Sequence, residues 1–234
     1  MDFNTESGGG SGAGGSSGGS GASPPRVSRG TTGGDFDYTN LGPSFVQTAR
    51  EVLFNPVGFF RGIRRQGDFL NPLIFAIICA LVSGVIGGIL GFLISLATGH
   101  GIGSSLASLI GTIILTPIGT AIGLFVGAAI YHLLVLLLGG ASHQGYEATF
   151  RVVAYAAVLQ IFSWLAVIPI LGALVLIAIA IYNVVLSVLG MREMHATTTG
   201  RAVAIVLIPV VVVTLFFALV FGAVLLAIFA AAQQ

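Results

Sequence analysis

Four polar side chains within the apolar stretches of this sequence could form a site, namely His132, Tyr155, Gln160 and Asn183. His132 precedes Gly139 by seven residues, and Asn183 precedes Gly190 by the same number. At ~1.5 Å per residue, both lie about 10 Å from the end of a helix. One hypothesis is a polar pocket in which His132 responds to protons. The alternative, which we favour, is hydrogen bonding that fixes helix packing, at about 0.6 kcal/mol for each bond.

A second set of residues could form an interaction surface, because their charges and aromatic rings fall where apolar stretches begin or end. It comprises Phe59, Phe60, Arg61, Arg64, Arg65, Glu147, Arg151, Arg192, His195 and Arg201. Glu147, Glu193 and His195 could together hold a metal ion. We favour the alternative that the two glutamates pair with neighbouring arginines, so no metal site is predicted.

The sequence predicts no catalytic or cofactor site. The pattern Gly-x-Ser-x-Gly occurs only in the low-complexity Gly/Ser-rich tail, where it forms no nucleophile elbow, and the sequence contains no His-Glu-x-x-His motif and no carboxylate within the long apolar stretches. A net charge of +1 without a dense basic cluster also gives no reason to expect a nucleic-acid partner.

The elements that must position these residues are expected to be membrane-spanning helices. The 234 residues are 56% hydrophobic and 7% charged, and the mean hydropathy is +1.03. Soluble domains carry roughly 25% charged residues. The composition therefore predicts an all-α, polytopic integral membrane protein.

Three apolar stretches account for five spans. Val152–Met191 runs for 40 residues without a charge and contains a turn signal at Ile168–Gly172, which suits two passages of ~20 residues. Phe69–Tyr146 is broken at Thr98–Ser105 and gives two more, and Ala202–Ala231 gives one. The expected spans are 71–97, 113–138, 150–168, 172–190 and 203–230.

Two features of the second span need interpretation. Residues 106–116 either extend it or form a separate interfacial helix, because Thr116-Pro117 follows them. Gly119, Gly123 and Gly127 recur every four residues and are expected to pack closely against another helix.

The arginines predict the orientation. With five spans, every arginine at a span boundary falls on the same side of the membrane. The positive-inside rule makes that side cytosolic. The chain is therefore expected in the cytoplasmic (inner) membrane, with its N-terminus in the cytosol and its C-terminus outside.

The N-terminal part is expected to contain two segments of different character. Residues 1–43 are rich in Gly and Ser and are predicted to be disordered. In residues 44–68, apolar residues recur at near-helical spacing and the arginines lie among polar neighbours. Asn55-Pro56 divides the segment, which predicts an amphipathic helix pair. This pair either lies in the membrane interface or covers the cytosolic end of the spans.

Several short motifs resemble the bacterial branch of the Yip-domain (Ypt-interacting protein) family over residues 50–220. They are Phe54-Asn55-Pro56-x-x-Phe59-Phe60, Asn71-Pro72-Leu73, Ala148-Thr149-Phe150-Arg151-Val152-Val153-Ala154-Tyr155, Ile168-Pro169-x-Leu171-Gly172, Gly190-Met191-Arg192-x-x-His195 and Gly200-Arg201-Ala202.

The resemblance implies five spans and a cytosolic N-terminus. Eukaryotic members of the family bind Rab-type GTPases in vesicle traffic, but this chain lacks the Asp-Leu-Tyr-Gly-Pro signature of that branch. For bacterial members the resemblance implies no catalytic chemistry.

Two functions from different classes follow from these patterns. The first is a non-enzymatic adaptor or organiser that presents its cytosolic face to membrane lipids or to a cytosolic or membrane protein. The alternative is a small transporter or channel that uses the region of His132, Tyr155 and Asn183.

Overall fold

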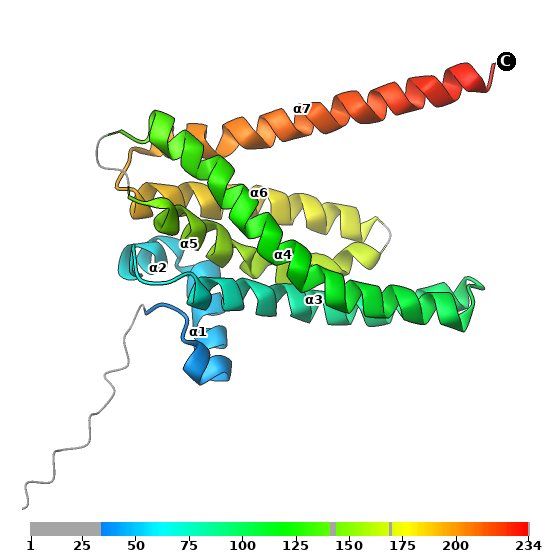
Figure 1. Cartoon of the computed structure of the whole chain (residues 1–234), viewed down its shortest axis with the longest axis horizontal. Helices are drawn as coiled ribbons and strands as arrows, with labels where there is room; N and C mark the ends of the chain where they lie inside the picture. The colour runs from blue at the N-terminus through cyan, green and yellow to red at the C-terminus, as the bar shows by residue number, and fades with distance from the viewer. Residues whose placement is uncertain (1–33, 141–143, 169, 234) are drawn as a thin grey trace, which may run out of the picture. The chain divides into compact units, whose positions relative to one another are not determined.

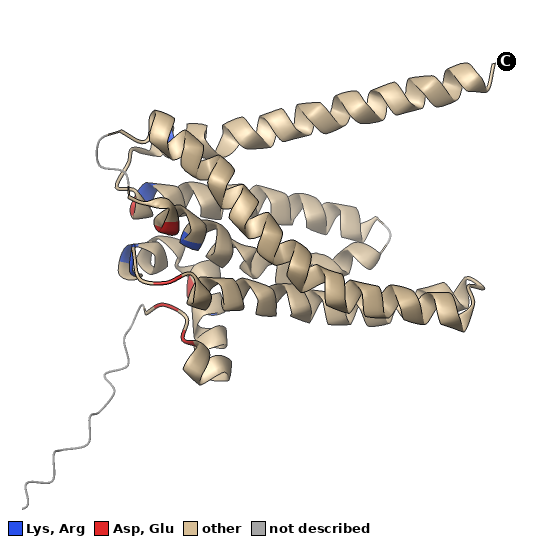
Figure 2. Ribbon diagram, viewed as in Figure 1, with Lys and Arg blue, Asp and Glu red and all other residues tan. Residues whose placement is uncertain are grey.

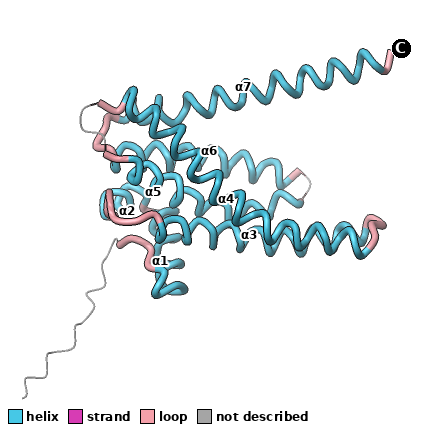
Figure 3. The backbone as a smooth tube through the Cα atoms, viewed as in Figure 1, coloured by secondary structure: helices cyan, strands magenta, loops and turns pink. Residues whose placement is uncertain are grey.

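The computed structural model describes residues 34–140, 144–168 and 170–233. All of them belong to one compact unit, Thr32–Gln234, and the other unit, Met1–Thr31, lies outside the described residues. The described residues form helices joined by short loops, and none of them lies in a strand (Figure 3). The expected disorder of residues 1–43 lies outside the described residues up to residue 33, whereas residues 34–43 are described and include helical residues.

Five helical stretches are long and apolar enough to cross a membrane, which confirms the predicted number. They are α3 (Leu70–Ala97), α4 (Ile102–Leu138), α5 (Tyr146–Ala156) continued by the 3₁₀-helix η2 (Ala157–Val167), α6 (Leu171–Met194) and α7 (Thr199–Ala231). Long uncharged stretches satisfy their backbone groups within lipid only as helices, which is why composition predicted these elements.

The second span is longer than expected, because α4 is one continuous helix that includes residues 106–116. Pro117 lies inside it. A proline removes one backbone N–H donor, and membrane helices tolerate this loss when neighbouring groups compensate for it. No separate interfacial helix therefore precedes the span.

The third span changes its helix type halfway. α5 and η2 have 11 residues each. A rise of ~1.5 Å per residue in the α-helix and ~2.0 Å in the 3₁₀-helix gives a length of roughly 38 Å. The 22 residues of this span are therefore long enough to cross a hydrocarbon core of ~30 Å, and the 3₁₀ half adds roughly 5 Å to the length that an α-helix would have.

Charged residues of the spans gather at one end, which we call the charged end (Figure 2). It is formed by the start of α3, α5 and α7 and by the last turn of α6, and Arg151 and Arg192 lie there. The turns at the opposite end, which join α3 to α4 and η2 to α6, contain no Asp, Glu, Lys or Arg.

Two short helices precede the spans, as the sequence predicted. α1 (Leu41–Phe54) crosses the spans near the charged end, and α2 (Pro56–Gly62) follows it directly (Figure 1). The side chain of Asn55 caps α2 by accepting a hydrogen bond from the Gly58 N–H at 3.2 Å. Tyr182 of α6 donates a hydrogen bond to the Leu53 carbonyl oxygen and fixes the end of α1.

The packed part of the chain begins earlier than residue 44. Phe36 is fully buried and contacts Phe75 of α3, with 5.6 Å between the ring centroids. Asp37 caps the short 3₁₀-helix η1 (Tyr38–Asn40). Hydrogen bonds from the Thr39 hydroxyl and N–H lower the pKa of the Asp37 carboxyl. The apolar side chain of Phe36 explains why this segment packs although its neighbours are small and polar.

The core lies toward the charged end, and the opposite parts of α4 and α7 are exposed. Buried residues of α7 are confined to its first two turns, at Ala202, Ile205 and Val206. Toward its C-terminus, α7 diverges from the other helices (Figure 1). Most of its apolar side chains beyond Pro209 are exposed. Such a surface suits contact with lipid.

Candidate functional site

Arg151 is the most deeply buried charge among the described residues, at 1% exposure. Its guanidinium contacts the Asp35 carboxylate at 2.7 Å and the Glu147 carboxylate at 3.2 Å. It also donates a hydrogen bond to the Asp68 carbonyl oxygen at 2.8 Å. The buried charge is therefore fully paired, and it links three segments that are distant in the sequence.

Tyr155 lies beside this ion pair and joins it to an aromatic cluster. Its hydroxyl donates a hydrogen bond to Asp35 at 3.1 Å. Its ring meets Phe59 at 4.9 Å and Phe75 at 5.3 Å between centroids. Asp35 thus accepts hydrogen bonds from both Arg151 and Tyr155, so the segment before α1 is held to α5 by polar and apolar contacts together.

His132 and His195 are connected through Thr149. The Thr149 hydroxyl lies 3.0 Å from His132 Nδ1 and 3.0 Å from His195 Nε2. The Gln144 N–H donates to His195 Nδ1 at 3.1 Å, so the neutral ring carries its proton on Nε2 and donates to Thr149. The Thr149 hydroxyl then donates to His132. The three residues fasten α4, α5 and the end of α6 to one another.

The exposed charges of this end form what we call the arginine patch, which consists of Arg61, Arg64 and Arg65 at the end of α2 and in the loop after it. Arg61 pairs with Glu193 at 3.1 Å, and 68% of its side chain is exposed. Within the described part of the chain, Arg64 and Arg65 form no ion pair. Arg201, in the first turn of α7, is exposed as well.

The structure divides the predicted interaction surface into exposed and buried members. Arg61, Arg64, Arg65 and Arg201 are exposed, and Glu147 and Arg192 are partly exposed. Phe59, Phe60, Arg151 and His195 are buried at 1% exposure or less, so their prediction as surface residues is wrong. The Phe59 ring packs against Tyr155 of α5, the Phe60 ring lies beside Gly190 of α6, and the two polar side chains find partners inside the bundle.

The carboxylates pair with arginines, as the sequence favoured. Glu147 contacts Arg151, and Glu193 contacts both Arg61 and Arg192. Among the described residues, no group of three or more His, Cys, Asp or Glu side chains could hold a metal ion.

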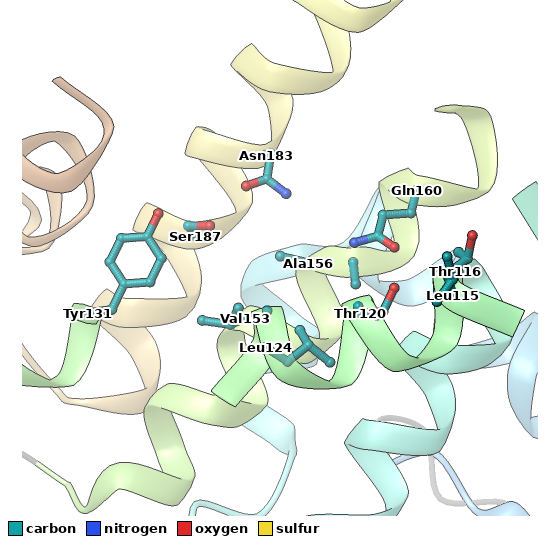
Figure 4. Close-up of a pocket in the computed structure, with 13 residues that line it drawn as sticks. Leu115, Thr116, Thr120, Leu124, Tyr131, Val153, Ala156, Gln160, Asn183 and Ser187 are labelled. Carbon is teal, nitrogen blue, oxygen red and sulfur yellow. The ribbon is translucent and has the colours of Figure 1, made fainter. Parts of the chain in front are cut away.

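A cavity of about 470 Å³ lies within the spans, between α4, the third span and α6 (Figure 4). Its polar lining consists of Thr116, Thr120, Tyr131, Gln160, Asn183 and Ser187. Gln160 and Asn183, two of the four residues considered for a polar pocket, do line this one cavity.

The other two residues of the predicted pocket lie elsewhere. His132 is part of the Thr149 contacts, and Tyr155 contacts Asp35 and the aromatic cluster. Neighbouring residues on a helix point about 100° apart, so Tyr131 faces the cavity while His132 faces α5. The sequence predicted that His132 and Asn183 lie at the same depth, but depth along a helix does not give the direction in which a side chain points.

The glycine row has a different role from the one expected. A Cβ atom added at Gly119 or Gly123 would meet no atom within 4 Å, and both residues line the cavity. A Cβ at Gly127 would meet one atom, Val153 Cγ1, at 4.0 Å. The row therefore borders open space instead of a closely packed helix.

Two residues that hold the charged end together were missed by sequence reasoning. Asp35 lies within the residues predicted to be disordered, although the adjacent Phe36 is a large apolar residue that favours packing. Thr149 belongs to the predicted Ala148–Tyr155 motif, but its partners His132 and His195 lie on other helices.

The fold and these contacts define a polytopic helical membrane protein whose charges are concentrated at one end. The family model described as "Yip1 domain" matches residues 50–222. The chain therefore belongs to the Yip1-domain family. No curated protein and no solved structure matches it.

Proposed function

We propose that this protein is a non-enzymatic membrane adaptor that uses its charged end to bind a protein partner or anionic lipid. The observation that carries the proposal is the arginine patch. Arg151 and Arg192 are neutralised by carboxylates of the same chain, whereas Arg64 and Arg65 offer their charge to solvent among the described residues. Exposed guanidinium groups suit bidentate recognition of carboxylates and phosphates.

α1 supports the same proposal through its outward face. Val46, Arg50 and Phe54 are spaced four residues apart, and all three are exposed, Phe54 at 81%. Apolar side chains around an arginine, on a helix that crosses the spans, are typical of a helix in the membrane interface. We propose that this end faces the cytosol, in accordance with the positive-inside rule.

Photocrosslinking in cells tests the proposal. A photoreactive residue replaces Gln66 beside the arginine patch or Thr199 in the first turn of α7, and both positions are exposed. We expect one recurrent protein or one class of anionic lipid at Gln66, and a loss of that product in Arg61→Gln/Arg64→Gln/Arg65→Gln.

A photoreactive residue at His100, in the exposed turn at the opposite end, is the matched control. A recurrent protein at Gln66 and Thr199 but not at His100 would identify a protein partner. Anionic lipid alone would identify lipid binding. Products that persist unchanged in the triple variant would overturn the assignment to the arginine patch.

A further inference from the structure

The cavity within the spans contains more polar groups than the protein itself satisfies. Among the described residues, the side chains of Thr116, Thr120, Tyr131, Gln160, Asn183 and Ser187 form no hydrogen bond with another residue, and none of their polar atoms is sealed away from the cavity. Ser83 and Ser163, by contrast, pair with each other across two spans at 2.6 Å.

The arrangement contradicts the role that was favoured for these residues. Gln160 and Asn183 do not hold helices together by bonding to each other, although both point toward the same space (Figure 4). In a hydrocarbon environment, each polar group without a partner costs several kcal/mol. The content of the cavity must therefore supply hydrogen bonds.

The lining also defines the chemistry of that content. It contains hydroxyl and amide groups, which both donate and accept, and it contains no charged side chain. The polar groups are spread along α4 from Thr116 to Tyr131, a length of roughly 22 Å at the helical rise. An acyl chain would leave all of them unpaired.

From these observations we infer that the cavity binds a neutral, polyhydroxylated small molecule. Its volume of about 470 Å³ is typical of small-molecule sites, which range from ~300 to ~1,000 Å³. Leu115, Leu124 and Val153 provide the apolar part of the lining, which could contact the carbon skeleton of such a ligand. This site is separate from the arginine patch and does not depend on the proposed adaptor function.

Protection of an engineered cysteine tests the inference in proteoliposomes that contain the full chain. Thr120→Cys places a thiol of similar size in the cavity, and the parent chain gives the background because its single cysteine, Cys79, is buried. N-ethylmaleimide is the reagent, glucose is the neutral probe, and gluconate is its anionic counterpart. We expect glucose to slow alkylation several-fold and gluconate to leave the rate unchanged.

A second substitution links the protection to the lining. Asn183→Leu keeps the approximate size of the side chain and removes its hydrogen bonds, so we expect about two- to tenfold weaker protection by glucose. His100→Cys, in the exposed turn between α3 and α4, should react at the same rate with and without glucose. If Thr120→Cys does not fold, Ser187→Cys serves as the reporter.

Three results would overturn the inference. A cavity cysteine that stays unreactive while His100→Cys reacts would mean that the cavity excludes polar molecules. Alkylation that glucose does not slow would mean that the cavity holds water alone. Equal protection by gluconate would contradict a site for neutral ligands.

Discussion

At the scale of single residues, Arg151 shows how a buried charge becomes part of a membrane protein's framework. A lone guanidinium within a span is costly, but Arg151 is surrounded by two carboxylates and a carbonyl oxygen. Removing it would leave Asp35 and Glu147 partly buried beside one another without a counter-charge. Removing one partner should therefore lower the free energy of unfolding by more than the intact ion pair contributes to it.

We expect Arg151→Met to lower the free energy of unfolding by about 3–5 kcal/mol, because buried carboxylates lose their partner. The matched control is Arg61→Gln, whose exposed pair with Glu193 should contribute no more than ~1 kcal/mol. Unfolding in mixed detergent micelles measures both. A similar, small effect of both substitutions would contradict the role assigned to Arg151.

The Thr149 hydroxyl provides a second prediction at this scale. Thr149→Val keeps the shape of the side chain and removes its hydrogen bonds to His132 and His195, so we expect a loss of about 1–3 kcal/mol in unfolding free energy. Thr149→Ser keeps the hydroxyl and should be nearly neutral. Equal stability of the Val and Ser variants would show that the hydroxyl does not matter.

At the scale of elements, two glycines in membrane helices should respond oppositely to the same change. A Cβ at Gly190 of α6 would lie 2.6 Å from Val152 Cγ1 and 3.1 Å from Phe60 Cζ, so Gly190→Ala should cost about 1–3 kcal/mol through overpacking. Gly123→Ala of α4 meets open space and should stabilise by up to ~1 kcal/mol through helix propensity. Thermal unfolding of the two variants measures the contrast.

The helices show which features could be predicted from the sequence and which could not. The number of spans followed from hydropathy, and the division of the N-terminal helices followed from Asn55-Pro56. The spacing of Gly119, Gly123 and Gly127 predicted close packing, but spacing does not reveal whether a neighbouring helix is present. The 3₁₀ form of η2 had no signal either, because its composition is that of an ordinary apolar helix.

The candidate sites were predicted only in part, because sequence spacing does not give the rotation of each helix about its axis. Gln160 and Asn183 were predicted to belong to one polar pocket and do share a cavity, whereas His132 and Tyr155, predicted for the same pocket, contact other partners. The choice depends on the rotation of each helix, which is set by contacts with distant segments. Asp35 is the clearest case, since its partner Arg151 lies 116 residues further along the chain.

At the scale of the whole molecule, the concentration of charge at one end predicts the topology. We expect alkaline phosphatase fused after Ala231 or inserted at Gly99 to be active, because the end opposite the arginines should lie outside. Green fluorescent protein inserted after Thr197, at the charged end, should fluoresce. Active phosphatase at the Thr197 position would contradict this orientation.

The pairing of Asp35 with Arg151 also has a consequence for biosynthesis. Asp35, which neutralises Arg151, is translated before the first two spans. It must remain available until the third span, which carries Arg151, has been synthesised. Assembly therefore cannot proceed strictly from one span to the next, because the third span completes its charge pairing only when the N-terminal segment returns to it. A chain that begins at residue 38 lacks Asp35 and should insert its third span poorly. A chain that begins at residue 34 keeps Asp35 and should insert this span normally. Glycosylation mapping of the two chains distinguishes these outcomes.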